Sequence, residues 1–329
     1  MRRVALLFVA ACSSSHSSTT DAPPGGGDGP PGTTDSAVDA PPAVKRTIFV
    51  IPMENEPSSA IYGNTTDAPY INSLMPMAAY ATKFQDELPA LPSEPHYIWM
   101  EAGTNAFTDI TFTNDNDASS THSTASTAHL TAQLDTANVS WMSYQQSMTA
   151  GTCPISTSGV YAPKHDPVVF FRDISGSPPS KTTAGCIAHH KPYSSFPGDL
   201  THPDTMAQYV FITPDLCHDM HGAASCPQGT NVAANIQAGD TWLSTELPPI
   251  LAYANAHDGL VLLVWDEGDS SNLVPFLALG PRIKPGAVAT TYSHSSQLKS
   301  IEEILGVPVL PSVTSANDFT DLFQPGMFP

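Results

Sequence analysis

The chain has 329 residues, of which 12 are Lys or Arg and 31 are Asp or Glu, so its formal net charge at pH 7 is −19. Proteins that bind nucleic acid or anionic membrane surfaces through charge need a basic face, and this balance excludes both classes. Hydrophobic residues make up 41% of the sequence, which is enough to fill a core.

The first segment has the pattern of a secretory signal. Two arginines precede an apolar run from Val4 to Ala11, which is too short to span a bilayer. The run ends in Val-Ala-Ala-Cys12, which resembles a bacterial lipobox, whose cysteine is lipidated and becomes the mature N-terminus. An ordinary signal with a chance cysteine is the alternative. We expect residues 1–11 to be a signal peptide and Cys12 to anchor an exported protein to the bacterial outer membrane or cell surface, or in the periplasm. Ser13 stands where an inner-membrane retention signal usually has Asp, and this resemblance favours the outer membrane.

Residues 12–44 are rich in Ser, Thr, Asp, Gly and Pro and contain almost no bulky side chains. A segment with nothing to bury cannot offset its ordering entropy, so we expect a disordered tether behind the lipidated cysteine. Residues 45–329 have the size of one large α/β domain, and no internal repeat divides them.

Four short apolar runs predict strands of a buried, mostly parallel sheet: 48–51, 209–212, 260–264 and 274–279. Polar groups follow each run. Glu54 and Asn55 come after the first run, Asp219 and His221 after the second, Asp266 and Glu267 after the third, and His294 after the fourth. Because ligands bind at the carboxyl ends of parallel strands, we expect an oxygen-rich pocket for a divalent cation there. Each group alone also fits a turn, a loop or a helix cap, so the prediction depends on their recurrence.

The segments between these strands carry weaker signals. A helix is expected around His129 to Leu134, and residues 141–205, rich in Pro, Gly and Cys, are expected to form a loop-rich cap beside the pocket. Histidines without a partner pattern, among them His122 and His190, are interpreted as mostly surface or loop residues.

Four cysteines fall within residues 45–329, where export favours disulfides over free thiols. Pairing by proximity in the sequence predicts Cys153–Cys186 and Cys217–Cys226, although four cysteines allow three connectivities. A metal site is the alternative, but the sequence lacks the Cys-x-x-Cys pairs typical of one.

Polar motifs follow one another in order along the body of the chain: Glu54-Asn55, Pro92-Ser93-Glu94-Pro95-His96-Tyr97, His165-Asp166-Pro167, Asp219-Met220-His221, Trp265-Asp266-Glu267-Gly268 and Ser293-His294-Ser295. Each motif is a weak signal, but the ordered set resembles the phosphoesterase family that includes bacterial acid phosphatases and phospholipases C. That family belongs to the alkaline phosphatase-like superfamily. The resemblance covers residues 47 to about 323 and implies a three-layer α/β/α sandwich with a mostly parallel central sheet.

The resemblance also implies roles for residues. Ser93 would be the nucleophile that forms a phosphoseryl intermediate, with a divalent ion of unknown identity held by Glu54, Asn55, Asp266 and Glu267. The flanking catalytic residues, which would contact phosphoryl oxygens or protonate the leaving alcohol, would be Asp219, His221 and His294. His96 and His165 would contact the substrate. Without the resemblance, Ser93 is better interpreted as a turn residue between two prolines, and His165 fits a structural role equally well.

The chain departs from the family pattern near the expected phosphate. Glu94 and His96 stand where the family has Leu and Asn, Asp166 replaces a second Asn, and Val264 replaces a Thr. We expect His96 to substitute for the Asn as a donor, and Asp166 to add negative charge near the pocket.

Three functions are consistent with the sequence. We favour a metal-dependent hydrolase of small phosphate esters of the acid phosphatase type. The nearest alternative is a phosphodiesterase of the phospholipase C type. The third is a surface lipoprotein that binds metal or phosphate without catalysis, which the changes at Glu94 and His96 motivate.

Overall fold

The predicted strands pair in one central sheet. In the computed structural model, which describes residues 45–268 and 272–328, eight strands lie in the order β5-β4-β6-β1-β7-β8-β2-β9. β1 pairs in parallel with β6 on one side and with β7 on the other, and β10 and β3 form a separate pair. The strands are β1 (Ile48–Met53), β2 (Ala79–Ala81), β3 (Phe84–Gln85), β4 (Trp141–Gln145), β5 (His190–Pro192), β6 (Tyr209–Thr213), β7 (Leu260–Trp265), β8 (Phe276–Leu279), β9 (Gly286–Val288) and β10 (Tyr292–Ser293). The signal peptide, Cys12 and tether predicted for residues 1–44 lie outside the described residues.

The fourth predicted strand runs the other way. β8 is antiparallel to β7, with Val264 opposite Phe276. Only a short connection joins the two strands, and a parallel neighbour would need a crossover of a dozen residues or more. The carboxyl end of β8 therefore lies at the opposite edge from the carboxyl ends of β1, β6 and β7, which corrects the expectation that all four ends meet.

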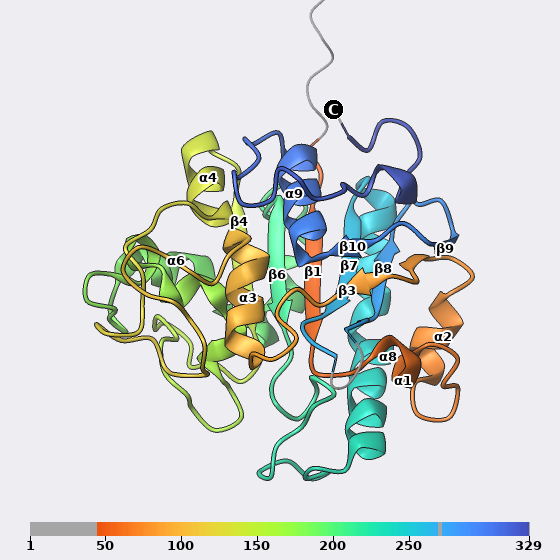
Figure 1. The fold of residues 1–329 in the computed structure, drawn as a ribbon, viewed down its shortest axis with the longest axis horizontal. Coiled ribbons are helices and arrows are strands. Elements are labelled where there is room, and N and C mark those ends of the chain that lie inside the picture. The colour runs from red at the N-terminus through yellow and green to blue at the C-terminus, as the bar shows by residue number, and fades with distance from the viewer. Residues whose placement is uncertain (1–44, 269–271, 329) are drawn as a thin grey trace, which may run out of the picture. The chain divides into compact units, whose positions relative to one another are not determined.

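Helices cover both faces of the sheet (Figure 1). α3 and α9 pack together on one face, while α8 packs against β7 and against α2, whose backbone N–H groups at Tyr70 and Ile71 donate to Asp240 of α8. The α/β/α sandwich is confirmed. The helices are α1 (Ser58–Ile61), α2 (Pro69–Leu74), α3 (Ser93–Ala102), α4 (Leu130–Ala137), η1 (Pro163–His165), η2 (Pro167–Phe170), α5 (Arg172–Ser175), α6 (Ala184–His189), η3 (Tyr193–Ser195), α7 (Phe196–Asp199), α8 (Val232–Ala256), α9 (His294–Leu305) and η4 (Thr320–Leu322).

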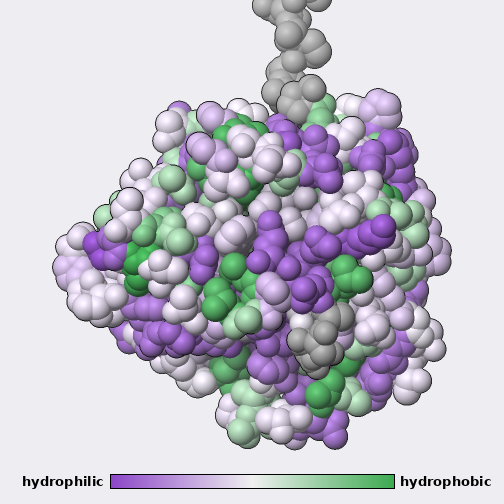
Figure 2. Space-filling view, viewed as in Figure 1, coloured by the Kyte–Doolittle hydropathy of each residue, from purple (hydrophilic) through white to green (hydrophobic). Residues whose placement is uncertain are grey.

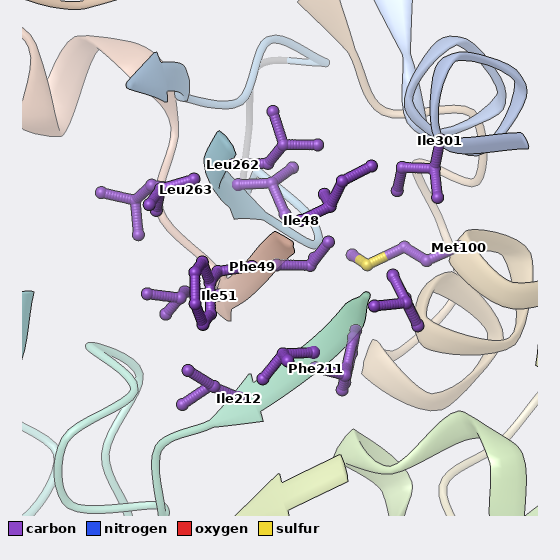
Figure 3. Packing of buried hydrophobic residues seen from close by; sticks show 14 of the residues in the cluster. Ile48, Phe49, Ile51, Met100, Phe211, Ile212, Leu262, Leu263 and Ile301 are labelled. Carbon is purple, nitrogen blue, oxygen red and sulfur yellow. The ribbon is translucent and has the colours of Figure 1, made fainter. Parts of the chain in front are cut away.

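The core packs on both sides of β1, as Figure 3 shows. All six residues of β1 are buried, and successive side chains of a strand point to opposite faces. Ile48 points toward Met100 of α3 and Ile301 of α9. Phe49 packs edge-on against Tyr253 of α8, with ring centroids 5.7 Å apart. Burial on both faces explains why these strands are continuous apolar runs without alternation.

The segment 141–205 is part of the sandwich. Its strands β4 and β5 extend the main sheet beyond β6, and short helices and loops connect them, so it is loop-rich as predicted but does not form a separate cap. The disulfide Cys153–Cys186 ties this segment together, and Cys217–Cys226 closes a loop after β6, so both predicted pairs are confirmed. α4 confirms the helix expected after His129. Within the described residues, no helix combines the length and the apolar character needed to cross a bilayer.

A buried ion cluster joins α3, α4 and α5. The ring of His129 is completely buried, with Nδ1 3.0 Å from Glu101 Oε1 and Nε2 2.9 Å from Asp173 Oδ2. Burial disfavours the charged ring, but the hydrogen bonds to Asp173 and Glu101 prevail and raise the pKa of His129 to about 9. His129 is therefore a structural cation.

We expect the free energy of unfolding to fall as pH rises toward alkaline values. Because the pKa of His129 is higher in the folded than in the unfolded chain, its stabilisation is complete below 6.5 and is lost as pH rises through about 9. The difference between these two pKa values of His129 corresponds to about 3 kcal/mol in the free energy of unfolding. Urea unfolding of the wild type and of His129→Gln at pH 6, 7.5 and 9 measures it. The same pH dependence in both proteins would contradict the assignment.

Candidate active site

Three strand-end loops meet at one edge of the sheet. Glu54 and Asn55 follow β1, and their backbone N–H groups donate to Asp219 O at 2.8 Å and to Asp266 Oδ1 at 3.0 Å. The loops after β6 and β7 are thus tied to the central strand. Asn55 has a φ of 46°, a left-handed conformation that Asn tolerates better than most residues and that turns the chain sharply after the strand. The structure therefore brings together the polar groups that follow three of the four predicted strands.

Ser93 is the first residue of α3 and lies among these acids. Its Oγ donates to Glu54 Oε2 at 2.8 Å and lies 3.3 Å from Glu267 Oε1. The ammonium group of Lys164 donates a hydrogen bond to Ser93 Oγ at 3.3 Å. The hydroxyl therefore has a carboxylate to accept its proton and a cation beside it, which is the surrounding that an activated serine needs.

Several buried oxygens of this cluster have no hydrogen-bond partner. They belong to side chains from all three strand-end loops: Asn55 Oδ1, Asp219 Oδ2 and Asp266 Oδ2. Two triads of donors could each hold a metal ion, Glu54 with His165 and Asp219, and His96 with Asp266 and Glu267. Carboxylate, amide and imidazole donors suit a divalent cation, and unpaired buried oxygens are otherwise costly. The residues present fit such an ion.

The acids of the cluster repel one another. Burial, followed by the charges of Glu54 and Glu267, raises the pKa of Asp266 well above its usual range. Burial also raises the pKa of Glu267 to about 7, with the charge of Glu54 adding to the rise and that of His96 opposing it. Burial acts the same way on Glu54, but the charges of His165 and Lys164 prevail and lower its pKa. A cation bound among these groups would relieve the repulsion.

Three predicted histidines surround the acids in different ways. His165 is buried against the ring of Tyr97, and its Nε2 lies 3.2 Å from Glu54 Oε1. The side chain of His221 is half exposed at the rim, with Nδ1 3.9 Å from Glu54 Oε2. His294 is buried at the start of α9, where its Nε2 lies 2.9 Å from Trp265 O. It reaches the site through α9 and not through β8.

His96 has protein partners on both ring nitrogens. Its Nε2 lies 2.9 Å from Asp86 Oδ1, and its Nδ1 lies 2.9 Å from Pro92 O. Burial disfavours the charged ring, but Asp86 prevails and raises its pKa. A direct contact between His96 and substrate would require one of these contacts to break. In the structure as it stands, His96 braces the turn that precedes Ser93.

The added acids Glu94 and Asp166 are each paired with a histidine. Glu94 Oε1 lies 2.5 Å from His122 Nε2, and Asp166 Oδ2 lies 3.2 Å from His190 Nε2. Asp166 and His190 are both buried, so the interpretation of His190 as a surface or loop residue is wrong. His122 is partly exposed and lies in a loop, as that interpretation expected. Each acid and its histidine are 28 and 24 residues apart, which hides the pairing in the sequence.

Lys164 and Asp115 are site residues that the sequence analysis missed. Lys164 donates to Asp115 Oδ2 at 2.9 Å as well as to Ser93. Its signal was its place directly before His165 in a chain with few cations. Asp115 lies in a polar loop far from every motif, and nothing in the sequence marks it.

The disulfide Cys217–Cys226 encloses Asp219 and His221 in a short loop. Asp219 Oδ1 accepts the backbone N–H groups of His221 and Gly222, each at 3.0 Å. The cross-link and these bonds restrict the loop, so Asp219 Oδ2 and the His221 ring are held beside Glu54.

Relatives with known names match the chain over most of its length. It is 29% identical over 290 residues to the phosphatidylinositol-3-phosphatase of Mycobacterium tuberculosis, an alignment that covers 87% of this chain and 85% of the relative. It is also 29% identical over 232 residues to the phosphate-repressible acid phosphatase of Penicillium chrysogenum, which covers 67% of this chain and 50% of the relative. The chain thus spans about half the length of that fungal enzyme.

Solved structures show the same fold at low identity. A protein in the alkaline phosphatase superfamily from Vibrio parahaemolyticus aligns with a TM-score of 0.53 and 10% identity, over 82% of this chain and 68% of that one. Murine ectonucleotide pyrophosphatase/phosphodiesterase 5 aligns with a TM-score of 0.54 and 9% identity, over 85% of this chain and 100% of that one. The phosphoesterase family model matches residues 84–308, which is more than half of the chain. The chain belongs to the phosphoesterase family and is a hydrolase of phosphate esters.

Proposed function

We propose that the chain is a metal-dependent phosphomonoesterase of the acid phosphatase type that works through a phosphoseryl intermediate on Ser93. The observation that carries the proposal is the position of Ser93 Oγ, 2.8 Å from Glu54 Oε2 and 3.3 Å from Lys164 Nζ, within a cluster of unpaired buried oxygens. The names of two relatives, a phosphatidylinositol phosphatase and an acid phosphatase, support phosphomonoester chemistry.

The reaction divides between two displacements at phosphorus. Ser93 Oγ loses its proton to Glu267, whose Oε1 lies 3.3 Å away, and attacks phosphorus, while the bond from phosphorus to the ester oxygen breaks. The leaving alcohol takes a proton from His221, whose ring is exposed at the rim. Water then gives a proton to His221 and attacks the phosphoserine, and the serine oxygen takes back the proton that it gave up as phosphate is released.

The other site residues hold this arrangement. We propose that Glu54, Asn55, Asp266 and Glu267 hold a divalent cation, with Asp219 and His165 beside it. When bound, such a cation supplies positive charge that stabilises the serine oxyanion and the phosphoryl oxygens. His294, with one nitrogen committed to Trp265 O, would orient the loop that carries Asp266. His96 would support Ser93 from below through Asp86 and Pro92.

The surface favours a small ester over a bilayer lipid as substrate. On the face seen in Figure 2, hydrophobic residues form small separate patches among hydrophilic ones. Within the described residues, the large hydrophobic side chains that are clearly exposed are Met77 and Val232. A lipase that works on a membrane usually presents a broader apolar patch.

We also propose export and lipid attachment at Cys12, in the outer membrane or the periplasm. The signal pattern of residues 1–11 and the two disulfides of the body support it, because disulfides persist in oxidising compartments. The mass of the mature N-terminal peptide tests it, and an unmodified Cys12 would exclude the anchor.

We expect the full chain, stripped of metal and resupplied with Mg²⁺, Mn²⁺, Ca²⁺ or Zn²⁺, to hydrolyse nitrophenyl phosphate faster than bis(nitrophenyl) phosphate or nitrophenyl phosphocholine. The release of nitrophenol at acidic and neutral pH measures this preference. Faster turnover of nitrophenyl phosphocholine would instead identify phospholipase C chemistry. Bound metal by elemental analysis without turnover of any ester would identify a binding protein.

A further inference from the structure

Lys164 is a basic residue whose side chain contacts the proposed nucleophile. Its Nζ lies 3.3 Å from Ser93 Oγ, and its side chain is 18% exposed. Four other basic side chains among the described residues form ion pairs with acids away from Ser93: Arg46, Arg172, Lys191 and Arg282. The cluster around Ser93 is otherwise rich in carboxylates, so an anionic phosphate needs this ammonium group in addition to any bound cation.

Asp115 occupies the groups that a phosphoryl oxygen would use. Its Oδ1 accepts the backbone N–H of Glu94 at 3.0 Å, and its Oδ2 accepts Lys164 Nζ at 2.9 Å. Both donors belong to the immediate surroundings of Ser93, one as the next residue of α3 and the other through a direct contact. The Asp115 carboxylate therefore stands beside the nucleophile as a bound anion would.

An incoming phosphate can replace the Asp115 carboxylate as the partner of Lys164 at a low cost in free energy. Asp115 is 35% exposed, so water screens its attraction to the ammonium group and can solvate it after release. A phosphate monoester carries close to two negative charges at neutral pH, whereas a diester carries one. Replacing the single charge of the Asp115 carboxylate beside Lys164 by a dianion strengthens the attraction to the ammonium group. Replacing it by a monoanion changes this attraction little.

We propose that Lys164 binds the phosphoryl group of the substrate and that Asp115 is the internal carboxylate that this group displaces, which makes the site selective for dianionic phosphate monoesters over diesters. A phosphorus atom in line with Ser93 Oγ brings its outer oxygens within reach of Nζ, because the two groups already touch. The inference rests on the proposed function for its substrate class. Its phosphate-binding part can be measured without turnover.

Calorimetric titration of the full chain with inorganic phosphate at pH 7.5 tests the binding part. We expect Lys164→Met to weaken phosphate binding at least about tenfold, because a hydrogen bond to a charged group is lost. Asp115→Asn keeps an acceptor for Glu94 N–H but removes the competing charge, so it should tighten binding about threefold. Lys191→Met removes a cation paired with Asp199, and Asp117→Asn removes an acid of the same loop that binds Thr157. These two controls should bind phosphate as the wild type does.

The ratio of kcat/KM for nitrophenyl phosphate to that for bis(nitrophenyl) phosphate tests the selectivity. Lys164→Met should lower this ratio at least about tenfold, and Lys164→Arg should recover part of it. Circular dichroism confirms that each variant is folded, and Lys164→Gln provides a second neutral variant. Unchanged phosphate binding in both neutral variants would overturn the role of Lys164. Weaker phosphate binding in Asp115→Asn would overturn the role of Asp115.

Different results would overturn the anion site at Lys164 and the proposed phosphomonoesterase function. Absence of phosphate binding by the wild type would overturn this inference while leaving ester hydrolysis open to the substrate panel. Phosphate binding that depends on Lys164, in a protein that hydrolyses no ester, would overturn the proposed function and leave the anion site standing.

Discussion

Ser93→Ala is expected to lower kcat for nitrophenyl phosphate by about 10⁴-fold or more, because it removes the hydroxyl group that the proposed function assigns as the nucleophile. The variant should fold, since among the described residues the hydrogen bonds of Ser93 Oγ are confined to Glu54, Glu267 and Lys164. Initial rates and far-ultraviolet circular dichroism measure the two properties. Mass spectrometry after an acid quench should show a phosphorylated peptide that contains Ser93 in the wild type and none in the variant.

Ser300→Ala is the matched control for this experiment. Ser300 is also buried in a helix, and its Oγ donates to Ser296 O at 2.7 Å, away from the acids. It should lose some stability and keep its activity. If Ser93→Ala retained activity within about tenfold of the wild type, Ser93 would not be the nucleophile.

Asp266→Asn is expected to lower kcat/KM by about 10³-fold and, in the presence of a chelator, to raise Tm. Activity falls because the variant loses a ligand of the proposed cation. Stability rises because burial and the charges of Glu54 and Glu267 disfavour an ionised Asp266 in the metal-free protein. Added divalent metal should raise the Tm of the wild type through binding to the folded state, and it should raise that of the variant much less.

Thermal unfolding with chelator and with each metal separates these effects. Asp204→Asn, which removes an exposed acid from the loop before β6, is the control and should respond to metal as the wild type does. A metal-induced rise in Tm of equal size in Asp266→Asn would exclude Asp266 as a ligand. A lower Tm for this variant in chelator would contradict the repulsion argument.

Much of this site follows from a local rule. β1, β6 and β7 are apolar runs buried on both faces, and an acidic residue or an acidic pair stands after each run. Parallel pairing of the three strands places Glu54, Asp219 and Asp266 at one edge without further information. The order of motifs then indicated the family, and the matching residues 84–308 confirm it.

The direction of β8 and the partners of charged groups did not follow from local patterns. An apolar run reads the same for a parallel and an antiparallel strand, because direction depends on the connection and on the neighbour it meets. The pairs Glu94–His122 and Asp166–His190 form across loops that only the packed chain brings together. Both added acids thus have a histidine partner within this protein.

The sequence by itself determined the acidic character of the chain, the strands that carry the candidate ligands, the disulfides and the family. Those properties are encoded in composition, in runs of neighbouring residues and in short spacings. Only the tertiary structure decided that Lys164 contacts Ser93, that Asp115 accepts a hydrogen bond from Lys164, and that the ring of His96 contacts Asp86. These contacts join residues that are 71, 49 and 10 positions apart, and their geometry depends on helix and loop packing that no local pattern records.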